Sequence, residues 1–514
     1  MRVTNTMIMN NSANNMNINK SNVDTLNNQM SSQKKISRPS DDPVIAIRAL
    51  RLRSTLSEID QYYEKNIPDA ESWLDVTQTA LKNMQEILTS IYKECNNGAN
   101  DTLNQSDRNT ILKNLNAMRE QIYAEGNADY AGRTVFTGYK TNESLTFGTS
   151  DPAESYTITE KLNYDNVSQK SYYSGLSSVP TIDEINAGQA PTTNVEDHTY
   201  SRIRLAYDNL DNGNIELNYI DALGNVKPIT SMPITYTDTD GATVTDTVTL
   251  ITNRSYDDWQ NAHDFQVGDN AILYIKETGE LIFGKNVEAQ INKDKPEMLI
   301  TYDKTGFEKG ELRPEHYFDC VKKTDPAEPI TYTKEEQKIS YTIAFNQTLD
   351  VNTEASDVFN SSIGRDIDEL TDAVQMAISA HEKVDSIKSM MTEERYADQD
   401  SQELLQKWLD AAEKEAAYAD DNMQNIYSKG ITAFQGYLTD VTLALTDVGS
   451  KGNRLDMTKS RMSNQQITFE KLKSQNEDRD LSDIIIDYTA AYTAYQSSMQ
   501  ASAKAIKQTL LDYI

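Results

Sequence analysis

Proline and glycine are distributed unevenly along this chain of 514 residues, and that distribution limits the possible folds more than any other feature. Nine of the 12 prolines and 11 of the 20 glycines lie between Asn142 and Asn346. The segment Asp69–Asp151 contains no proline, and none follows Pro329. Proline inside a helix removes a hydrogen bond and clashes with the preceding turn, so long helices need its absence. The sequence therefore predicts two helical flanks around an insert rich in turns.

Both flanks carry hydrophobic residues at alternating steps of three and four, the spacing that places one apolar stripe on a packed or supercoiled helix. In the first flank, two stripes are separated by the turn-prone segment Asn96–Asp101, which predicts a helical hairpin. The second flank carries two more stripes, so several helices are expected to pack side by side. The four stripes are Ile67, Ala70, Leu74, Thr77, Leu81, Met84, Leu88 and Ile91; Ile111, Leu115, Met118 and Ile122; Leu405, Trp408, Ala412, Ala419, Met423 and Ile426; and Leu438, Val441, Leu445, Val448, Leu455 and Met462.

The insert has the pattern of β-structure, because Thr, Tyr, Val and Ile alternate with polar residues between glycine turns. Two hairpins are expected, and we expect the insert to form an all-β outer domain or two small ones. The predicted fold class is α+β and multidomain, in which long N- and C-terminal helices form a coiled-coil or helical-bundle core with a β-rich central insert. The hairpins are Ile234–Thr239 with Thr243–Leu250 around Asp240-Gly241, and Ala271–Lys276 with Leu281–Phe283 around Thr278-Gly279.

Five segments are expected to build these domains. Residues 1–43 and 475–514 would form a terminal helical domain, and residues 44–141 and 347–474 an inner helical-bundle domain. Residues 142–346 would form the β-rich outer insert, as one or two subdomains.

Each end of the chain carries an apolar stripe that has no partner nearby in the sequence. The first 55 residues carry eight basic and three acidic side chains, whereas Glu477–Ile514 carries three basic and six acidic ones, so the ends attract each other. We expect them to form an antiparallel helix pair that is disordered in the free chain, because about 35 residues per end bury little surface alone. The stripes are Met9, Met16, Val23 and Met30, and Ile485, Tyr488, Tyr492, Tyr495, Met499, Ser502, Ile506, Leu510 and Tyr513.

The sharpest local motif is Arg38-Pro39-Ser40-Asp41-Asp42-Pro43. Asp42 is suited to cap a helix that begins at Pro43, since proline in the first position loses no hydrogen bond. We expect the motif to be an interdomain joint, restricted by its two prolines but not held in place by hydrogen bonds. Acid-base catalysis by Asp41 and Asp42 would need a pocket that adjacent loop aspartates rarely provide. The stripe of the predicted helix is Ile45, Leu52, Leu56, Ile59 and Tyr63.

Few residues suggest catalysis or metal binding. The segment His381–Asp385 has aspartate where a zinc-protease helix has its second histidine, and we interpret it as a solvated helix face. The segment Asp238–Gly241 begins like a calcium loop but lacks the later ligands, which favours a turn. Neither a nucleophile elbow nor a phosphate-binding loop occurs. We expect no enzymatic activity, no catalytic residue, no cofactor and no metal site.

Charge and composition exclude further classes of function. The chain has 49 Lys and Arg against 79 Asp and Glu, a net charge of −30, which argues against nucleic-acid binding. Two distant cysteines, Cys95 and Cys320, cannot form a disulfide framework. No apolar run approaches the ~20 residues of a membrane helix. The first 30 residues hold ten asparagines and lack the apolar region of a cleaved signal peptide.

Three segments of the sequence resemble the bacterial flagellin superfamily. They are Leu26–Pro43 with its Arg-Pro-Ser-Asp-Asp-Pro motif, the turn Tyr130–Gly138, and the tail Leu510–Ile514. The resemblance covers residues 1–141 and 347–514. Within the superfamily, Asp447–Leu455 is more similar to the proteins at the hook-filament junction than to flagellin. The filament subunit, flagellin, stays the alternative.

The resemblance implies a structural protein of the extracellular flagellum that joins hook to filament. It implies export by the flagellar type III apparatus without a cleaved signal peptide, with an export chaperone as a further partner. It also implies self-assembly into a ring or tube, in contact with the proximal hook-filament junction protein and with flagellin, but not with nucleic acid or membrane. The assembly interface would be Met9, Met16, Val23, Met30, Ile485, Tyr488, Tyr492, Tyr495, Met499, Ile506 and Leu510.

Overall fold

A computed structural model of the chain describes residues 5–99, 104–173, 178–191, 195–212, 215–221, 223–237, 240–261 and 266–507. The chain divides into two compact units. The first unit comprises Met1–Glu71, Ser340–Leu349 and Gly452–Ile514, and the second comprises Ser72–Ile339 and Asp350–Lys451. The domain boundaries expected from the sequence stay predictions. The expected fold class is confirmed, because long helices at both ends flank a β-rich central region.

The first unit is mainly helical. A π-helical turn joins α2 to α3, and the Ile67 N–H donates there to the carbonyl of Tyr62, five residues earlier. This widened turn comes directly before Pro68, which would clash with the preceding turn of a regular helix. The elements are α1 (Asn5–Ser32), α2 (Pro43–Gln61), the π-turn η1 (Tyr62–Asn66), the start of α3 (Ile67–Gly98), the hairpin β16 (Ser340–Ala344) and β17 (Gln347–Asp350), the end of α10 (Gln399–Glu477), and α11 (Leu481–Lys507).

Four helices form a bundle in the second unit: α3, α4 (Gln105–Glu125), α9 (Ser361–Met391) and α10. Hydrogen bonds from Asn83 to Glu125 (3.1 Å) and from Asn114 to Glu94 (3.0 Å) confirm the predicted antiparallel hairpin of α3 and α4. The two C-terminal stripes lie on one helix of 79 residues, α10, and not on separate helices. Its Gly430 does not end the helix. A Cβ there would lie 3.1 Å from Cys95 Sγ, so glycine allows α10 to approach α3 closely.

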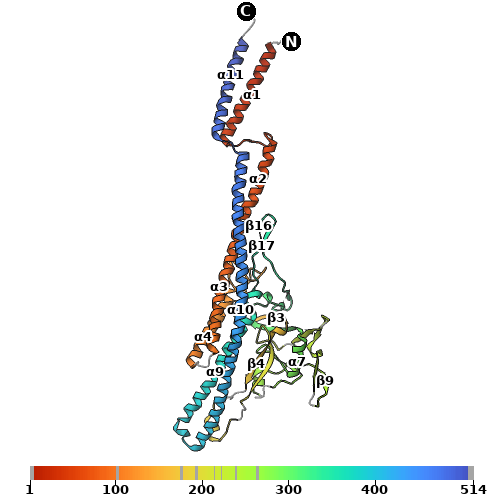
Figure 1. Cartoon of the computed structure of the whole chain (residues 1–514), viewed down its shortest axis with the longest axis vertical. Helices are drawn as coiled ribbons and strands as arrows, with labels where there is room; N and C mark the ends of the chain where they lie inside the picture. The colour runs from red at the N-terminus through yellow and green to blue at the C-terminus, as the bar shows by residue number, and fades with distance from the viewer. Residues whose placement is uncertain are drawn as a thin grey trace, which may run out of the picture. The chain divides into compact units, whose positions relative to one another are not determined.

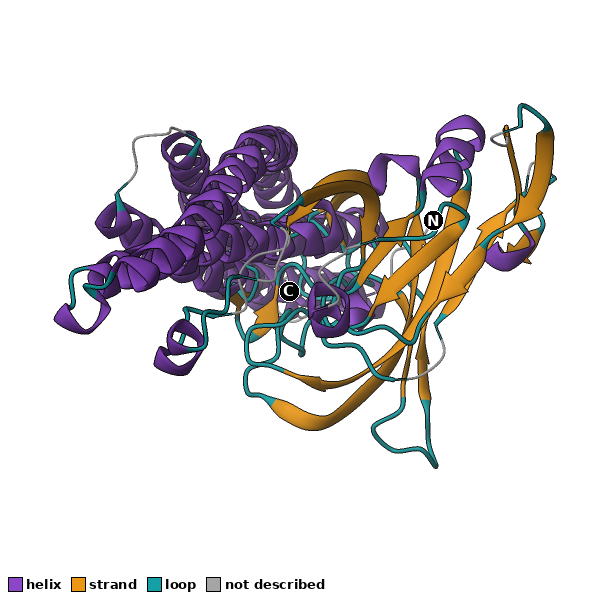
Figure 2. Cartoon of the chain, turned by 90° about the horizontal axis from the view of Figure 1, so that it is seen from below, coloured by secondary structure: helices purple, strands orange, loops and turns teal. Residues whose placement is uncertain are grey.

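The strands of the insert form two main sheets, which Figure 2 shows grouped together. The order of the six-stranded sheet is β15-β14-β3-β13-β6-β7, and that of the five-stranded sheet is β10-β11-β12-β5-β4. Both predicted hairpins are present, as β8 with β9 and β11 with β12. The strands are β3 (Asp151–Leu162), β4 (Val167–Tyr173), β5 (Asp197–Arg204), β6 (Glu216–Ile220), β7 (Val226–Pro228), β8 (Pro233–Thr237), β9 (Thr243–Thr247), β10 (Thr249–Ile251), β11 (Ala271–Ile275), β12 (Glu280–Phe283), β13 (Glu297–Phe307), β14 (Asp319–Lys322) and β15 (Ile330–Tyr332).

The expectation of an all-β insert is wrong, because short helices lie between the strands. In α7 (Lys285–Asp294), Val287 and Ile291 are four residues apart and face the main core, which is the helical spacing. Strand β11 is buried along its whole length, since Ile272 and Tyr274 join the main core and Leu273 and Ile275 join a second cluster around Trp259. The other short helices are α5 (Ile182–Asn186) and α6 (Tyr256–Asn261), and α8 (Ala355–Val358) follows the insert.

A buried carboxyl group makes the stability of the insert depend on pH. Glu160 Oε1 accepts hydrogen bonds from the Ala206 N–H (2.9 Å) and from the Tyr302 hydroxyl. Burial raises the pKa of Glu160 to about 7. At pH values between the ordinary pKa of glutamate, about 4.3, and the raised pKa of Glu160, the folded protein keeps a proton that the unfolded chain has lost. The free energy of unfolding therefore falls as the pH rises through this window.

Glu160→Gln keeps the acceptor oxygen and removes the ionisation. We expect the substitution to raise the free energy of unfolding by about 2 to 3 kcal/mol at pH 8, and to change it little at pH 4. Urea unfolding at both pH values measures the difference. Equal effects at pH 4 and pH 8 would show that Glu160 is not protonated in the folded protein.

Candidate functional site

The two terminal helices of the first unit lie side by side and antiparallel. Figure 1 shows α1 and α11 in contact along their lengths, with both ends of the chain at the same end of the pair. The Asn19 amide donates to Ser498 Oγ at 2.5 Å across the pair. Residues 479 positions apart are thus neighbours. This is the antiparallel pair that the sequence predicts.

One face of each helix forms the seam between α1 and α11. On α11, Ile484 is fully buried and Tyr488 and Tyr495 are half-buried. On α1, three members of the predicted stripe are half-buried: Met16, Val23 and Met30. The spacing of three and four therefore identified the seam, although it selected Ile485 where Ile484 is the buried residue.

The other half of the predicted stripe is exposed and forms what we call the outer face of the pair. Its members on α11 are Ile485, Tyr492 and Met499, which are 47%, 43% and 41% exposed, and Met9 on α1 is 44% exposed. The rings of Tyr488 and Tyr492 stack with their centroids 6.0 Å apart, so the outer face continues from the seam. The sequence analysis missed further exposed apolar residues on these helices: Met7, Ile8, Ile18, Leu481 and Ile486. Leu510 and the side chain of Ile506 lie outside the described residues.

A short backbone ladder joins the ends of α1 and α11 that lie near the joint. The Lys35 N–H donates to the Glu477 carbonyl at 2.7 Å, and the Arg479 N–H donates to the Gln33 carbonyl at 3.0 Å. The Lys34 ammonium also pairs with Asp478. The opposite charges of the two ends thus meet at residues 33–35 and 477–479.

The carboxylate of Glu477 is the centre of this contact. Its side chain is 3% exposed and accepts two hydrogen bonds from Arg53 of α2, one at 2.8 Å from Nε and one at 2.6 Å from Nη2. Lys34 Nζ lies 3.6 Å from the same carboxylate. The hydrogen bonds from Arg53 and both positive charges hold the pKa of Glu477 below its usual range, so the group stays ionised at neutral pH.

The Arg38–Pro43 segment is a hydrogen-bonded turn. Asp42 Oδ1 accepts from the N–H groups of Val44 and Ile45 at 2.9 and 3.1 Å, which confirms Asp42 as the cap of the helix that begins at Pro43. Asp41 Oδ2 accepts from the N–H groups of Ser37 and Arg38 at 3.0 and 2.8 Å. The expectation that hydrogen bonds do not hold this segment is therefore wrong, because its aspartates fold back on the backbone.

Removing the charge of Glu477 is expected to loosen the ladder. Glu477→Gln cannot hold both Arg53 nitrogens and Lys34, and the loss is about 1 kcal/mol because Arg53 is partly exposed. Amide exchange at Lys35 and Arg479 should become about fivefold faster. The control is Glu470→Gln, at an exposed carboxylate of α10. Unchanged exchange in Glu477→Gln would show that the backbone hydrogen bonds alone hold the ladder.

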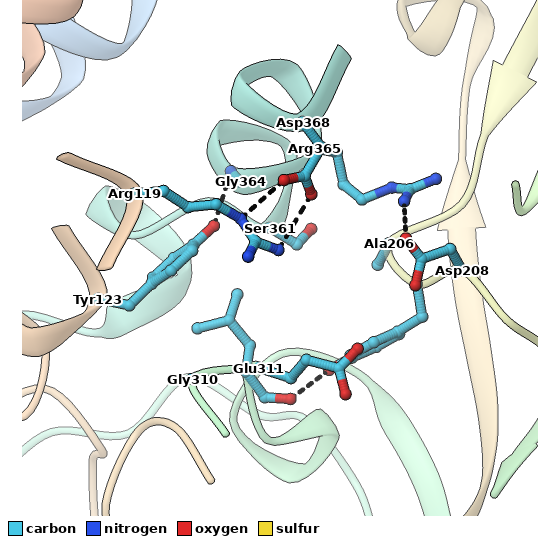
Figure 3. A pocket seen from close by; sticks show the side chains of 12 residues that line it. Arg119, Tyr123, Ala206, Asp208, Gly310, Glu311, Ser361, Gly364, Arg365 and Asp368 are labelled. Atoms are coloured by element: carbon cyan, nitrogen blue, oxygen red, sulfur yellow. Dashed lines mark hydrogen bonds and ion pairs between the residues drawn. The ribbon is translucent and has the colours of Figure 1, made fainter. Parts of the chain in front are cut away.

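A second polar cluster anchors the insert to the bundle. Figure 3 shows the carboxylate of Asp368 on α9 facing Arg119 of α4, with their closest atoms 2.8 Å apart, and Arg365 facing Asp208 at 2.5 Å. The Tyr123 hydroxyl accepts from the Gly364 N–H at 2.8 Å. The cavity between these groups measures about 40 Å³, which is room for one or two water molecules. This polar cluster attaches the insert to the bundle, since a cavity of this size is too small for a substrate.

An ionic cluster makes a further attachment between the five-stranded sheet and α9. The carboxylate of Glu369 accepts from Arg202 at 2.6 Å to each oxygen and from Arg204 at 2.8 Å. Arg204 also pairs with Asp366, and Arg202 with Glu280. Burial raises the pKa of Glu369, but the charges of Arg202, Lys170 and Arg204 outweigh it and hold the pKa well below its usual range.

The remaining sequence candidates have structural roles. His381 Nε2 lies 2.9 Å from Asp420 Oδ2, so this histidine joins α9 to α10, while its side chain is 34% exposed and Glu382 and Asp385 are exposed, as expected of a solvated helix face. Asp240 and Gly241 belong to the turn between β8 and β9, and Gly241 has a φ of 78°; residues 238 and 239 lie outside the described residues. Within the described ranges, no helix has an apolar stretch of the length that crossing a membrane requires.

Residues 3–141 match a protein family described as the bacterial flagellin N-terminal helical region. The chain is 32% identical over 123 residues to flagellar hook-associated protein 3 of Salmonella typhimurium. The aligned residues make up 23% of this chain and 37% of that protein. It is also 32% identical over 120 residues to flagellar hook-associated protein 3 of Escherichia coli. These residues make up 22% of this chain and 36% of that protein. The chain thus spans just over a third of the length of these curated relatives.

Among solved structures, the chain is similar to a putative flagellar hook-associated protein from Vibrio parahaemolyticus. The match covers 85% of this chain and all of that chain, with 14% identity and a TM-score of 0.34. A score this low does not establish a common arrangement of the whole chain.

Proposed function

We propose, from the flagellin-type N-terminal region that residues 3–141 form, that this protein is a structural component of the bacterial flagellum. In particular, we propose that it is the adaptor that joins hook to filament. The matched relatives from Salmonella typhimurium and Escherichia coli are hook-associated proteins, and their names support this position. The protein would act by assembly and not by catalysis.

The observation that carries the proposal is the outer face of the α1–α11 pair. Soluble surfaces rarely keep large apolar side chains in a continuous row, and such a row marks an interaction site. Here Ile485, Tyr492 and Met499 follow one side of α11 at intervals of seven, each more than two fifths exposed. A regular stripe on a long helix suits packing against another helix of the same kind. The occupant we propose is the corresponding pair of a neighbouring copy.

Burial of the outer face would supply the free energy of assembly. Each Tyr, Met or Ile side chain that becomes buried contributes on the order of 1.5 to 3 kcal/mol. The helix pair itself has polar residues, Ser12 and Asn19, in its seam, so neighbouring copies would stabilise it as well. Assembly would then be coupled to the stability of the terminal pair, since binding shifts a pair that is only marginally stable in the single chain toward its folded state.

The proposed partners are other copies of the chain, the proximal hook-filament junction protein on one side and flagellin on the other. The proposed location is the extracellular flagellum at the junction. The chain would reach it through the flagellar type III export apparatus, with or without an export chaperone, and without cleavage of a signal peptide. The joint Arg38–Pro43 would link the assembling pair to α2.

The runner-up is flagellin, because the matched N-terminal family is described for bacterial flagellin itself. The two proteins differ in number and place. An adaptor would be scarce and would occupy one point on each flagellum, whereas a filament subunit would be abundant along its whole length.

Immunogold electron microscopy with an antibody against the insert, on flagella still attached to their hooks, tests the proposal. One cluster of label at the boundary between hook and filament is the expected result. Label along the filament would make the protein a flagellin. Absence of label from both would overturn the proposed location, provided that the antibody binds the purified protein.

A further inference from the structure

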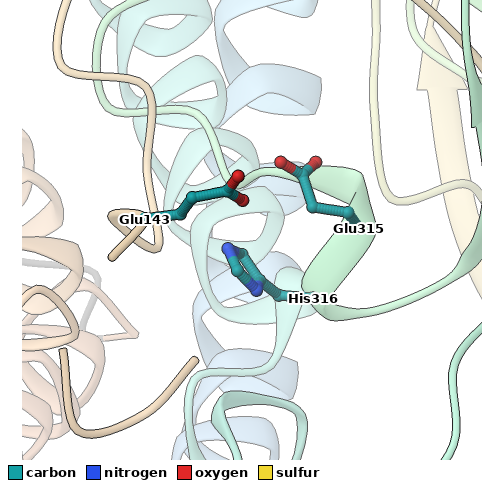
Figure 4. A group of neighbouring side chains, drawn as sticks. All are labelled: Glu143, Glu315 and His316. Atoms are coloured by element: carbon teal, nitrogen blue, oxygen red, sulfur yellow. The ribbon is translucent and has the colours of Figure 1, made fainter. Parts of the chain in front are cut away.

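Three metal-ligating side chains meet inside the second unit. Glu143 follows the small hairpin β1 (Asp129–Tyr130) and β2 (Arg133–Thr134), while Glu315 and His316 lie in the 3-10 turn η4 (Pro314–His316). One ligand atom of each lies within 4.8 Å of those of the other two. Figure 4 shows the two carboxylates facing each other, with the imidazole ring next to Glu143. Segments more than 170 residues apart thus converge on one point.

Two carboxylate oxygens at this point lack a hydrogen bond. Glu143 Oε2 and Glu315 Oε2 are both buried, and neither has a partner among the residues that the structure describes. The side chain of Glu315 is only 2% exposed, and its other oxygen lies 3.4 Å from Arg313 Nη1. Buried polar atoms almost always have a partner, because an unmet carboxylate oxygen is costly in a medium of low polarity. The two oxygens are therefore open to a hydrogen-bond donor or a cation on the side where the carboxylates meet.

The imidazole of His316 is placed where it can reach a metal bound by the two carboxylates. The residue is 6% exposed, and one of its ring nitrogens lies within 4.8 Å of an oxygen of each carboxylate. A neutral imidazole offers one nitrogen lone pair to a metal. Nε2 lies 3.3 Å from the Ser144 carbonyl oxygen, and when Nε2 donates a hydrogen bond to that oxygen the lone pair of the ring is on Nδ1.

We propose that Glu143, Glu315 and His316 form a binding site for a divalent transition-metal ion of the zinc class. One imidazole nitrogen with two carboxylate oxygens suits Zn²⁺, Mn²⁺ or Co²⁺, whereas Ca²⁺ and Mg²⁺ prefer oxygen donors alone. Small rotations of the side chains would bring each donor atom to about 2.0 to 2.2 Å from the ion, the distance at which nitrogen and oxygen ligands bind zinc. The role of the ion would be structural, since it would tie the loop after β2 to η4.

Lys140 is the rival partner of the two carboxylates. Its ammonium is buried without a hydrogen-bond partner among the described residues and lies 3.5 Å from the centre of the Tyr332 ring. The Glu143 N–H donates to the Lys140 carbonyl at 3.0 Å, so the lysine and this carboxylate belong to one turn. With Arg313, this lysine could neutralise both carboxylates and leave no need for a metal. The two possibilities respond in opposite ways to the removal of the lysine charge.

Calorimetric titration of the full-length, chelator-treated protein with ZnCl₂ tests the site. We expect one zinc ion per chain, and at least tenfold weaker binding in Glu315→Gln and in His316→Ala. Glu143→Gln, at a half-buried position, gives the same test with less risk to folding. Glu328→Gln removes an exposed carboxylate elsewhere in the insert and should leave the affinity unchanged. Lys140→Met should tighten zinc binding, because it removes a repelling charge.

A thermal-unfolding scan with and without zinc gives a second readout. Zinc should raise the midpoint of the second unit in the wild-type protein and not in Glu315→Gln. The proposal is overturned if no zinc ion binds stoichiometrically, or if Glu315→Gln and Glu143→Gln bind zinc as well as wild type. A loss of stability in Lys140→Met without any response to zinc would identify the lysine as the partner of the carboxylates. None of these outcomes depends on where the protein resides in the flagellum.

Discussion

Tyr492→Asp is expected to abolish assembly while the single chain stays folded. Tyr492 lies on the outer face of the α1–α11 pair and is 43% exposed, so a charge there costs the monomer little. In the contact with a neighbouring copy, the variant would lose the burial of the part of Tyr492 that the single chain leaves exposed, roughly 1 kcal/mol. It would also bury an aspartate without a partner, which costs at least about 2 kcal/mol more. Each 1.4 kcal/mol is tenfold in a binding constant, so every contact would weaken by about a hundredfold or more.

Two matched variants on α11 separate assembly from folding. Ser497→Asp adds the same charge at an exposed polar position of α11 that lies away from both the outer face and the seam, and it should assemble normally. Tyr495→Asp places the charge in the seam and should lower the helix content of the monomer, as well as prevent assembly. Circular dichroism of the monomer and electron microscopy of the flagella measure both effects. Normal assembly of Tyr492→Asp would show that the outer face is not the contact surface.

Glu369→Gln is expected to destabilise the second unit by about 3 kcal/mol or more. Arg202, which is 4% exposed, and Arg204, which is 15% exposed, would lose the carboxylate that both share. Breaking a buried ion pair costs more than the pair contributes, because the remaining charge stays buried. Because the folded-state pKa of Glu369 lies well below its usual range, the contribution of the cluster to stability is complete above about pH 5 and falls progressively at lower pH, where the unfolded chain binds a proton that the folded protein does not.

Asp385→Asn on the same helix provides the control, since Asp385 is exposed. The double variant Glu369→Gln with Arg202→Met removes charges of both signs and should recover part of the lost stability. Urea unfolding followed by tryptophan fluorescence measures all three proteins, because Trp259 packs against the same sheet. A Glu369→Gln variant as stable as Asp385→Asn would mean that Asp366 and Glu280 alone satisfy the two arginines.

Local signals were enough to predict the helical flanks and the cap at Asp42, because a spacing of three and four, or an aspartate before a proline, involves only a few neighbouring residues. The pairing of the two distant ends was predictable for another reason, their opposite charges and unpaired apolar stripes. The two strongest hairpins were predictable from local signals as well, since Asp240-Gly241 and Gly279 supply the turns. At Gly279 the φ of 62° and the nearby Tyr207 carbonyl, 2.1 Å from a would-be Cβ, allow only glycine.

Other features depend on contacts between distant segments, which no local pattern contains. Helix α7 was missed because ten residues between two strands carry only Val287 and Ile291 as a helical signal. The continuity of α10 was missed because the apolar stripe is interrupted between Ile426 and Leu438, although the helix is not. The Glu143–Glu315–His316 cluster could not be found at all, since its first member lies 172 residues before the second and neither neighbourhood has ligand spacing. Half of the terminal stripe faces outward for a similar reason: periodicity identifies apolar positions but not what covers them.

The distance in sequence between α1 and α11 has a consequence for quality control. The two helices of the pair are separated by nearly the whole chain, as the contact between Asn19 and Ser498 shows. A chain whose synthesis stops early has α1 but no α11, and a single asparagine-rich helix of 28 residues has little stability alone in water. An assembly that accepts only the paired helices therefore rejects truncated subunits without a separate proofreading factor. Completeness of the polypeptide would itself be the requirement for incorporation.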